Sequence, residues 1–217
     1  MNSRDSILQR LRGELSNHPA VEKPPVSEVW PIEDPSTSAM AQEFVEELAA
    51  LQGEVIRCAS MAVAREQLSR LVHQAGWNSI GAMDRPSVHE AAGGLAQDSL
   101  HCDFTNWTSH QMAELAVSVV EADLLLADTG SCMVACPTRT DRLLCYLPPA
   151  CVVVARESQL CEHIAAAWTK IAPRVADPSL GGEFVLLTGP SRTADIEKIL
   201  ILGVHGPKRL VVLLVEE

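Results

Sequence analysis

The sequence predicts an α/β fold with a mainly parallel sheet and helices on both faces. Short apolar segments rich in Val, Leu and Ile alternate with amphipathic stretches of about 10 to 15 residues, as in consecutive strand–helix units. The 217 residues are 47% hydrophobic but only 4% aromatic, so the predicted core consists mostly of aliphatic side chains. A chain of this length can bury such a core without disulfides or structural metals.

The first 38 residues are expected to form a separate appendage. Ile7, Leu8, Leu11 and Leu15 recur at helical spacing and predict a helix over 2–16. Five prolines follow between His18 and Ser38, and prolines at this density disrupt both helices and sheet ladders. We therefore predict an N-terminal helix plus Pro-rich linker over 1–38 and an α/β domain over 39–217.

Within the domain, the apolar pattern predicts helices over 39–51, 60–75, 109–120 and 158–171. It predicts strands over 53–59, 78–83, 123–127, 132–135 and 150–155, whereas 84–108 has no clear pattern. Residues 184–215 are expected to form a βαβ unit, with a helix after Gly189-Pro190 and a Gly-rich turn before the last strand.

The charge and the apolar pattern exclude several classes of partner. With 17 basic and 28 acidic residues the net charge is −11, and no basic face is evident, so nucleic acids and anionic membranes are poor partners. No N-terminal apolar signal is evident, and no apolar run approaches the roughly 18 residues of a membrane-spanning helix. A cytoplasmic protein is expected.

The seven cysteines are expected to be reduced and largely buried. Cys58, Cys145 and Cys151 lie among apolar neighbours, where an unpaired cysteine usually acts as a small hydrophobic residue. Cys132 and Cys136 with Cys145 and Cys151 are a possible metal-binding set, and His101-Cys102-Asp103 is another. Neither contains the Cys-x-x-Cys pair of common zinc and iron–sulfur sites. The prediction is that this chain holds no metal and no cofactor.

The turn after the strand at 184 is the first candidate ligand site. If Gly189-Pro190 opens a helix, the free N–H groups of its first turn, with Ser191, Arg192 and Thr193, could bind a carboxylate or phosphate. Alternatively, Ser191 or Thr193 simply caps that helix. The turn that would end the helix contains Gly203, His205, Gly206 and Pro207. It would lie far from Ser191, so His205 is expected to be structural.

A second candidate turn, Asp128-Thr129-Gly130-Ser131, follows the strand at 123–127. If that strand and the strand at 184 run in the same direction, both turns open onto one pocket. Asp128 would then act as a base, nucleophile or ligand-orienting group, and Arg139 and Arg142 could neutralise an acidic ligand. The alternative is a simple turn in which Asp128 bonds its own backbone.

Two stretches resemble the LUD-domain family: 122–131 with the sequence ADLLLADTGS, and 188–207 with TGPSRTADIE at its start and GVHGP at its end. Arg142 followed by Leu147-Pro148-Pro149 also fits, and Ile7-Leu8 resembles the start of the lactate-utilising subgroup. Cys132 and Cys136 depart from the family pattern, which has apolar or small residues there.

The resemblance implies a fold similar to the phosphosugar-isomerase and CoA-transferase-like group. It also implies a subunit that acts with iron–sulfur partner subunits in the oxidation of L-lactate to pyruvate. Two alternatives stay open: a stand-alone transferase- or isomerase-like enzyme that acts on a small acyl or phosphosugar anion, and a non-catalytic assembly subunit. The resemblance gives no agreed catalytic residue for this subunit. From the positions of the two turns we predict Asp128 as the catalytic residue, with the ligand in contact with Thr129, Gly130, Ser131, Arg142 and Gly189 to Thr193.

Overall fold

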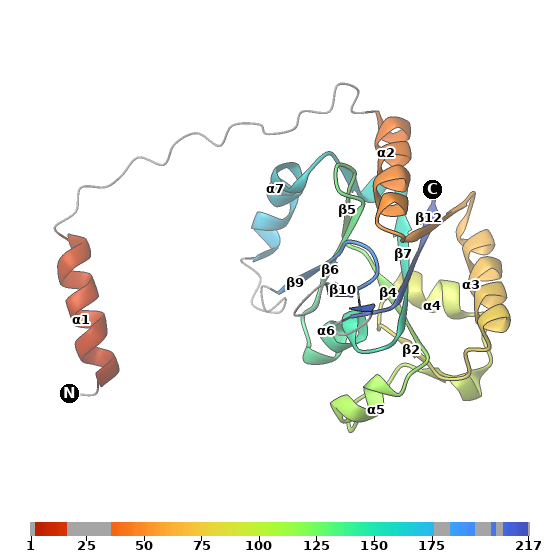
Figure 1. The fold of residues 1–217 in the computed structure, drawn as a ribbon, viewed down its shortest axis with the longest axis horizontal. Helices are drawn as coiled ribbons and strands as arrows, with labels where there is room; N and C mark the ends of the chain where they lie inside the picture. The colour runs from red at the N-terminus through yellow and green to blue at the C-terminus, as the bar shows by residue number, and fades with distance from the viewer. Residues whose placement is uncertain (1–2, 17–35, 176–182, 194–200, 203–205, 217) are drawn as a thin grey trace.

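The computed structural model describes residues 3–16, 36–175, 183–193, 201–202 and 206–216. Helix α1 (Ser3–Ser16) has no buried residue and stands apart from the other elements in Figure 1. The remaining elements form an α/β body around a six-stranded and a four-stranded sheet, with a two-stranded pair as a third, small sheet. None of the helices in the described part of the chain is long and apolar enough to cross a membrane.

The larger sheet has six strands, all parallel, which confirms the predicted fold class. In spatial order they are β1 (Glu54–Cys58), β12 (Arg209–Val215), β7 (Ala150–Arg156), β4 (Val117–Glu121), β2 (Ile80–Ala82) and β3 (Leu100–His101). The central strands are nearly continuous runs of Val, Leu and Ala. Such runs are typical of parallel strands that are buried on both faces.

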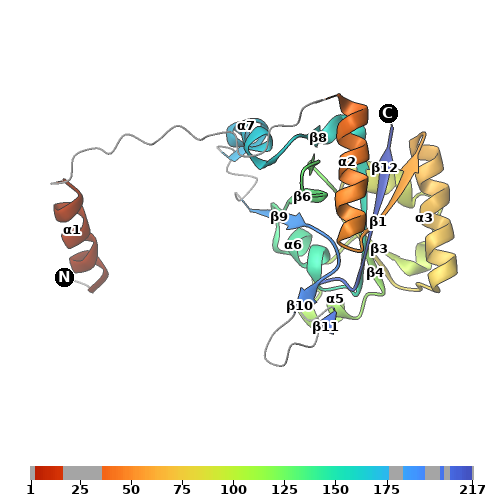
Figure 2. The ribbon, with the colours of Figure 1, turned by 45° about the horizontal axis from the view of Figure 1, so that its top comes forward.

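Helices cover both faces of this sheet (Figures 1 and 2). One face packs against α3 (Met61–Ala75) and α4 (Pro86–Ala92). The other lies against α6 (Arg139–Tyr146), with α2 (Thr37–Ala50) along β1 and the short α5 (Ser109–Ala113) beside α6. The caps of α3 follow the expected chemistry, because the Ser60 hydroxyl accepts the Val63 N–H and Gly76 ends the helix at φ 64°. Two single 3-10 turns, Gln97–Ser99 and Glu157–Gln159, precede β3 and β8.

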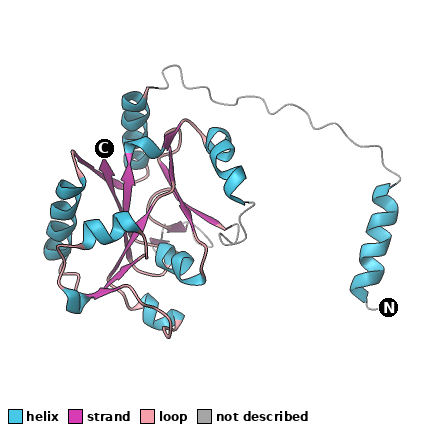
Figure 3. Ribbon diagram, turned by 180° about the vertical axis from the view of Figure 1, so that it is seen from behind, coloured by secondary structure: helices cyan, strands magenta, loops and turns pink. Residues whose placement is uncertain are grey.

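A second, four-stranded sheet lies on the α2 and α6 side of the molecule. Its order is β8 (Leu160–Cys161), β5 (Leu124–Leu126), β6 (Ser131–Ala135) and β9 (Phe184–Leu187). β6 is antiparallel to both of its neighbours. Helix α7 (Ile164–Val175) packs Ala167 and Ile171 against one face of this sheet and forms a small separate core with Leu124, Leu126 and Met133. Figure 3 shows both sheets from behind.

The helix predicted over 109–120 is wrong in its second half. Only Ser109–Ala113 is helical, and Val117–Glu121 forms β4, at the centre of the parallel sheet. Val117, Val119 and Val120 are fully buried, and β-branched residues favour the pleated conformation. The helix predicted over 158–171 begins only at Ile164, while α4 and α6 were not predicted.

The βαβ unit predicted over 184–215 is also wrong. β12 joins the parallel sheet as expected, but β9 pairs with β6 in the other sheet. Arg192–Thr193 forms a short strand, β10, antiparallel to β11 (Ile201–Leu202), where the first helical turn was expected. The rest of the expected helix, residues 194–200, lies outside the described residues.

Candidate functional site

The two predicted turns lie at the same end of the four-stranded sheet. β5 and β9 each pair antiparallel with the strand between them, β6, so they run in the same direction, as predicted. The turn Asp128–Ser131 follows β5, and Thr188–Ser191 follows β9. This end of the sheet is close to the amino ends of β7 and β12, because the Ser191 N–H donates to the Pro207 carbonyl and the Lys208 N–H to that of Pro149. It is therefore not the carboxyl edge of the parallel sheet that the βαβ prediction implied.

A chain of hydroxyl groups joins the two turns. The Thr129 hydroxyl donates to Asp128 Oδ1 at 3.2 Å, and its oxygen lies 2.9 Å from Ser131 Oγ. Ser131 Oγ in turn lies 2.8 Å from Thr188 Oγ1. Ser131 is buried and Thr188 is exposed, so the chain leads from the carboxylate through the protein to the surface beside Gly189.

The C-terminal end of α2 closes over both turns. A side chain at Gly130, where φ is 58°, would collide with the backbone of Leu48. A Cβ at Gly189, where φ is 98°, would lie 3.1 Å from Leu51 Cβ. The Arg192 guanidinium donates to the Leu51 carbonyl at the end of the same helix. Glycine is required at both turns because α2 approaches closely and φ is positive.

Asp128 is half-buried between this helix and β8. Its backbone N–H donates to the Glu162 carbonyl at 3.1 Å. The pKa of Glu43, on α2, is raised by burial and then by the charge of Asp128. Asp128 does not line either of the two cavities described below.

A cavity of about 390 Å³ lies beside the second turn. Its lining includes three of the predicted ligand residues, Gly189, Ser191 and Arg192, together with Thr188 and Pro207. Tyr146 also lines it and was not predicted. Thr129, Gly130, Ser131 and Pro190 are not part of the lining.

Arg142 was predicted to contact the ligand, but it does not line this cavity. Its guanidinium is paired with the Glu183 carboxylate. The Tyr146 side chain and then Glu183 raise the pKa of Arg142. It thus supports Tyr146, one helical turn further on, instead of contacting a ligand. Arg139 is also bonded elsewhere, to the Ser109 hydroxyl at 2.6 Å.

Within the described residues, the turn at Gly189 does not open a helix, because Arg192 and Thr193 are in a strand, so the predicted anion site at a helix N-terminus is not formed there. This strand pairing also corrects the expected distance between Ser191 and the turn that contains His205. The chain folds back, so that Gly206 and Pro207 lie directly beside Ser191, and Gly206 lines the same cavity. Gly203 and His205 lie outside the described residues, as does the side chain of Thr193.

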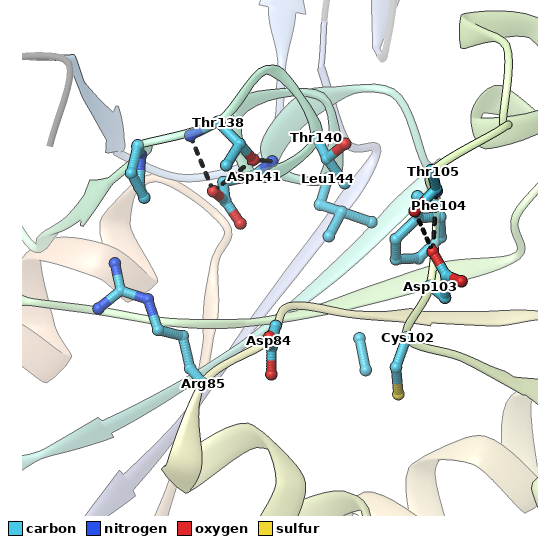
Figure 4. A pocket seen from close by; sticks show the side chains of 12 residues that line it. Asp84, Arg85, Cys102, Asp103, Phe104, Thr105, Thr138, Thr140, Asp141 and Leu144 are labelled. Atoms are coloured by element: carbon cyan, nitrogen blue, oxygen red, sulfur yellow. Dashed lines mark hydrogen bonds between the residues drawn. The ribbon is translucent and has the colours of Figure 1, made fainter. Parts of the chain in front are cut away.

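A second cavity, of about 420 Å³, opens at the carboxyl edge of the parallel sheet. It lies beyond the ends of β2 and β3 and beside the first turn of α6. Figure 4 shows Asp84 and Arg85 across from Thr138, Asp141 and Leu144, with Cys102 to Thr105 at one end. The chain leaves β2 toward β3 but leaves its neighbour β4 toward β7, so the direction of the connections reverses here. In open α/β sheets, ligands bind at such a reversal.

Most of the polar side chains of this second cavity are already bonded. Arg85 donates to the Ala135 carbonyl at 3.1 Å and lies 3.8 Å from Asp123. Asp141 and Thr138 cap α6 reciprocally. The Thr105 hydroxyl and N–H hold the pKa of Asp103 below its usual value, while burial and then Asp84 raise the pKa of the Cys102 thiol. The lining contains three carboxylates and one guanidinium.

The cysteines follow the expectation of small buried residues. Six are buried, and only Cys102 is exposed. Burial raises the pKa of Cys132 and raises that of Cys151 to about 12. Cys136 Sγ and Cys145 Sγ are 3.9 Å apart, and their contact lowers the pKa of Cys136 and raises that of Cys145. Within the described ranges, no group of three or more His, Cys, Asp or Glu side chains is arranged to hold a metal ion.

The chain is similar to proteins named lactate utilization protein C, to an uncharacterized protein and to a solved structure. Lactate utilization protein C of Bacillus pumilus (strain SAFR-032) is 31% identical over 126 residues, which cover 57% of this chain and 52% of that protein. The protein of the same name from Shouchella clausii (strain KSM-K16) is 28% identical over 149 residues, or 68% and 60% of the two chains. YkgG of Escherichia coli (strain K12), an uncharacterized protein, is 30% identical over 112 residues, or 49% and 47%. The matched segment thus spans about half the length of the first of these relatives.

A DUF162 family protein from Deinococcus radiodurans, solved by crystallography, superimposes with a TM-score of 0.64 at 17% identity. The match covers 84% of this chain and 99% of the crystallised one, and it shows the fold alone. The LUD domain itself matches residues 41–215, which is most of the α/β body. The chain belongs to the LUD-domain family.

Proposed function

We propose that this chain is a lactate-utilisation subunit that binds a small carboxylate, L-lactate in the first instance. The family membership and the names of the relatives support this assignment. Oxidation of L-lactate to pyruvate releases two electrons and two protons. In this proposal the electrons pass to separate iron–sulfur subunits, in the cytoplasm, and this chain holds no cofactor of its own.

The observation that carries the proposed ligand class is the charge of the cavity beside Gly189–Arg192. Among the residues that the structure describes, its polar side chains are the hydroxyls of Tyr146, Thr188 and Ser191 and the guanidinium of Arg192, and none of these described lining residues carries a carboxylate. Hydroxyl groups and a guanidinium donate hydrogen bonds to an anion, and an N–H···O⁻ bond from a guanidinium is among the stronger ones. The other cavity, with three carboxylates, disfavours an anion.

Asp128 has a role in this proposal as a positioning residue. The hydroxyl chain Thr129–Ser131–Thr188 links its carboxylate to the cavity. When the ligand hydroxyl gives its proton to Thr188, each hydroxyl can pass one proton to the next, and Asp128 accepts the last one. This path carries one of the two protons; the second proton and the two electrons come from the C2–H bond and leave to the partner subunits. Asp128 thus acts through Thr188 and does not touch the ligand.

The test is L-lactate binding to the full chain, measured by ligand-observed NMR. Arg192→Gln removes a charged donor and should weaken binding about tenfold or more, since such bonds contribute roughly 1.5–3 kcal/mol. Ser191→Ala removes one neutral donor and should cost about 1 kcal/mol. Lys208→Gln is the matched control, because Lys208 is a nearby cation outside the cavity lining. Equal affinities for Arg192→Gln and Lys208→Gln would exclude this cavity.

The cavity at the carboxyl edge is the second candidate, favoured by its position at the reversal of strand order. The alternative of a stand-alone transferase- or isomerase-like enzyme would place its small anion here, where Arg85 would be the one cationic contact among the described lining residues, against three carboxylates. Loss of lactate binding in Arg85→Gln, with Arg192→Gln unaffected, would move the site there. Normal lactate-dependent growth with both variants would instead favour the assembly subunit.

A further inference from the structure

Tyr146, the last residue of α6, reaches the proposed carboxylate cavity from a different element than the other polar lining residues. Thr188, Ser191 and Arg192 all belong to the segment that follows β9, whereas α6 follows β6. The Tyr146 ring is half-buried and packs against the main hydrophobic core. The core therefore fixes the ring, and the hydroxyl group is the part of this side chain that can hydrogen bond to a ligand.

The hydroxyl of Tyr146 is oriented by Arg142, one helical turn earlier on α6. The hydrogen bond with Tyr146 and then the charge of Glu183 raise the pKa of Arg142. Glu183, directly before β9, holds the Arg142 guanidinium in an ion pair. A guanidinium has five N–H donors and no acceptor, so the Tyr146 oxygen must accept in this contact. The Tyr146 O–H is thereby left to donate to another group, and it is a stronger donor because its oxygen accepts from a cation.

Each of the other polar side chains of this cavity already has a part in the proposed function. Arg192 and Ser191 donate to the ligand carboxylate, and Thr188 accepts the proton of the C2 hydroxyl. When that proton leaves, the C2 oxygen gains negative charge and then becomes the carbonyl oxygen of pyruvate. A donor aimed at this oxygen stabilises the charge that develops on it. Among the described lining residues, Tyr146 is the donor that remains.

We infer that Tyr146 donates to the C2 oxygen of the ligand and so makes the cavity selective for 2-hydroxy and 2-oxo acids over carboxylic acids without an oxygen at C2. Arg142 is the positioning residue that directs the hydroxyl, and Glu183 holds Arg142 in turn. This inference rests on the proposed function, because it requires lactate in this cavity. It deepens that function, since a site with only Arg192 and Ser191 as donors would bind any small carboxylate alike.

The experiment measures the dissociation constants of L-lactate and propionate by ligand-observed NMR on the full chain. Propionate has the same carboxylate and carbon chain as lactate but no oxygen at C2. Wild type should bind lactate more tightly than propionate. Tyr146→Phe should weaken lactate binding about five- to tenfold while propionate binding stays within about twofold. The phenylalanine ring keeps the packing against the core, and a thermal unfolding curve checks that each variant is folded.

Arg142 is tested by the ratio of the two dissociation constants. Arg142→Met should lower the preference for lactate, and Arg142→Lys should restore part of it because an ammonium group can also donate to the Tyr146 oxygen. Arg139→Met is the matched control, since Arg139 lies on the same helix, is bonded to Ser109 and is outside the cavity lining. It should leave the ratio unchanged.

Two results for the variants would overturn this inference alone. In the first, Tyr146→Phe weakens the binding of both acids by the same factor. In the second, Tyr146→Phe changes neither affinity while Arg192→Gln weakens both. A wild type without preference for lactate would also overturn it. If Arg192→Gln leaves lactate binding unchanged, the proposed site itself is excluded, and the inference with it.

Discussion

Ser131 Oγ and Thr188 Oγ1 lie 2.8 Å apart across the β6–β9 pair, although the two residues are 57 positions apart in the chain. This contact joins the two turns that the sequence singled out. It also connects buried Ser131 with Thr188, which lines the proposed carboxylate cavity. The contact therefore relates the packing of the second sheet directly to the proposed site.

The first prediction concerns the energy of this contact. Ser131→Ala and Thr188→Val should each destabilise the protein, and the double variant should lose less than their sum. The expected coupling is about 1 kcal/mol, the usual net contribution of a neutral hydrogen bond. Urea unfolding of the two single variants and the double variant measures it. Strictly additive losses would show that the two hydroxyls do not interact.

The second prediction concerns the pair Asp128 and Glu43. Burial first and then Asp128 raise the pKa of Glu43, so the folded state holds that proton more tightly than the unfolded state. Ionised Glu43 therefore lowers the free energy of unfolding. This loss is absent below the pKa of Glu43 in the unfolded chain, near 4, and fully present above its pKa in the folded protein. Asp128→Asn removes the part of this loss that comes from the charge of Asp128. The variant should be at least as stable as wild type at pH 7, and this relative gain should vanish on acidification below about pH 4.

Thermal unfolding at both pH values, combined with lactate-dependent turnover of the reconstituted system, separates stability from function. We expect Asp128→Asn to reduce turnover while the fold stays intact. A large loss of stability at pH 7 would mean that Asp128 holds the turn together. Normal turnover in a folded variant would remove Asp128 from the proposed proton path.

The third prediction compares two glycines with similar backbone angles. Gly76 has φ 64° and open space around it, so Gly76→Ala should cost about 1–2 kcal/mol from the left-handed conformation alone. Gly130 has φ 58°, and a Cβ there would strike Leu48. Gly130→Ala should therefore cost clearly more, by at least about 2 kcal/mol. Equal losses in urea unfolding would show that α2 moves aside at little cost.

The sequence was sufficient to predict the parallel α/β class, because that class depends on local apolar runs alternating with amphipathic stretches. The two turns lie together only through the antiparallel pairing of β5 and β9 with β6, which the sequence did not predict. It failed at β4 because Val117–Glu121 is buried on both faces and shows no alternation that would distinguish it from a helix. It failed at β9 because pairing with β6 depends on contacts between residues far apart in the chain.

The cavity at the carboxyl edge could not be found from the sequence either. Asp84, Cys102 and Thr138 come from three separate segments, which become neighbours only through the pairing of β2 with β3 and the packing of α6. One local signal was available. Thr138-x-x-Asp141 is a capping pattern, and it marks the start of α6, whose first turn borders that cavity.

The fourth prediction concerns the N-terminal arm. A protein that starts at Ser36 should keep its thermal midpoint within a few degrees of the full chain at low protein concentration, because α1 has no buried residue. Ser36 must be retained, since its hydroxyl accepts the Ala39 N–H at the start of α2. Insoluble protein from this shortened chain would show that the arm completes the core.

The last prediction concerns the thiols. Cys102 is exposed and the other six cysteines are buried, so one thiol per folded chain should react quickly with iodoacetamide and the others only on unfolding. Burial and Asp84 raise the pKa of Cys102, and the thiolate is the reactive form, so the rate should still be rising at pH 9. Mass spectrometry of the alkylated protein identifies the modified residue, and Cys102→Ser should abolish the fast phase.

We also expect anaerobically purified protein to be colourless and metal-free by elemental analysis. One iron or zinc per chain, lost on Cys132→Ser or Cys136→Ser, would show instead that the buried thiols hold a metal.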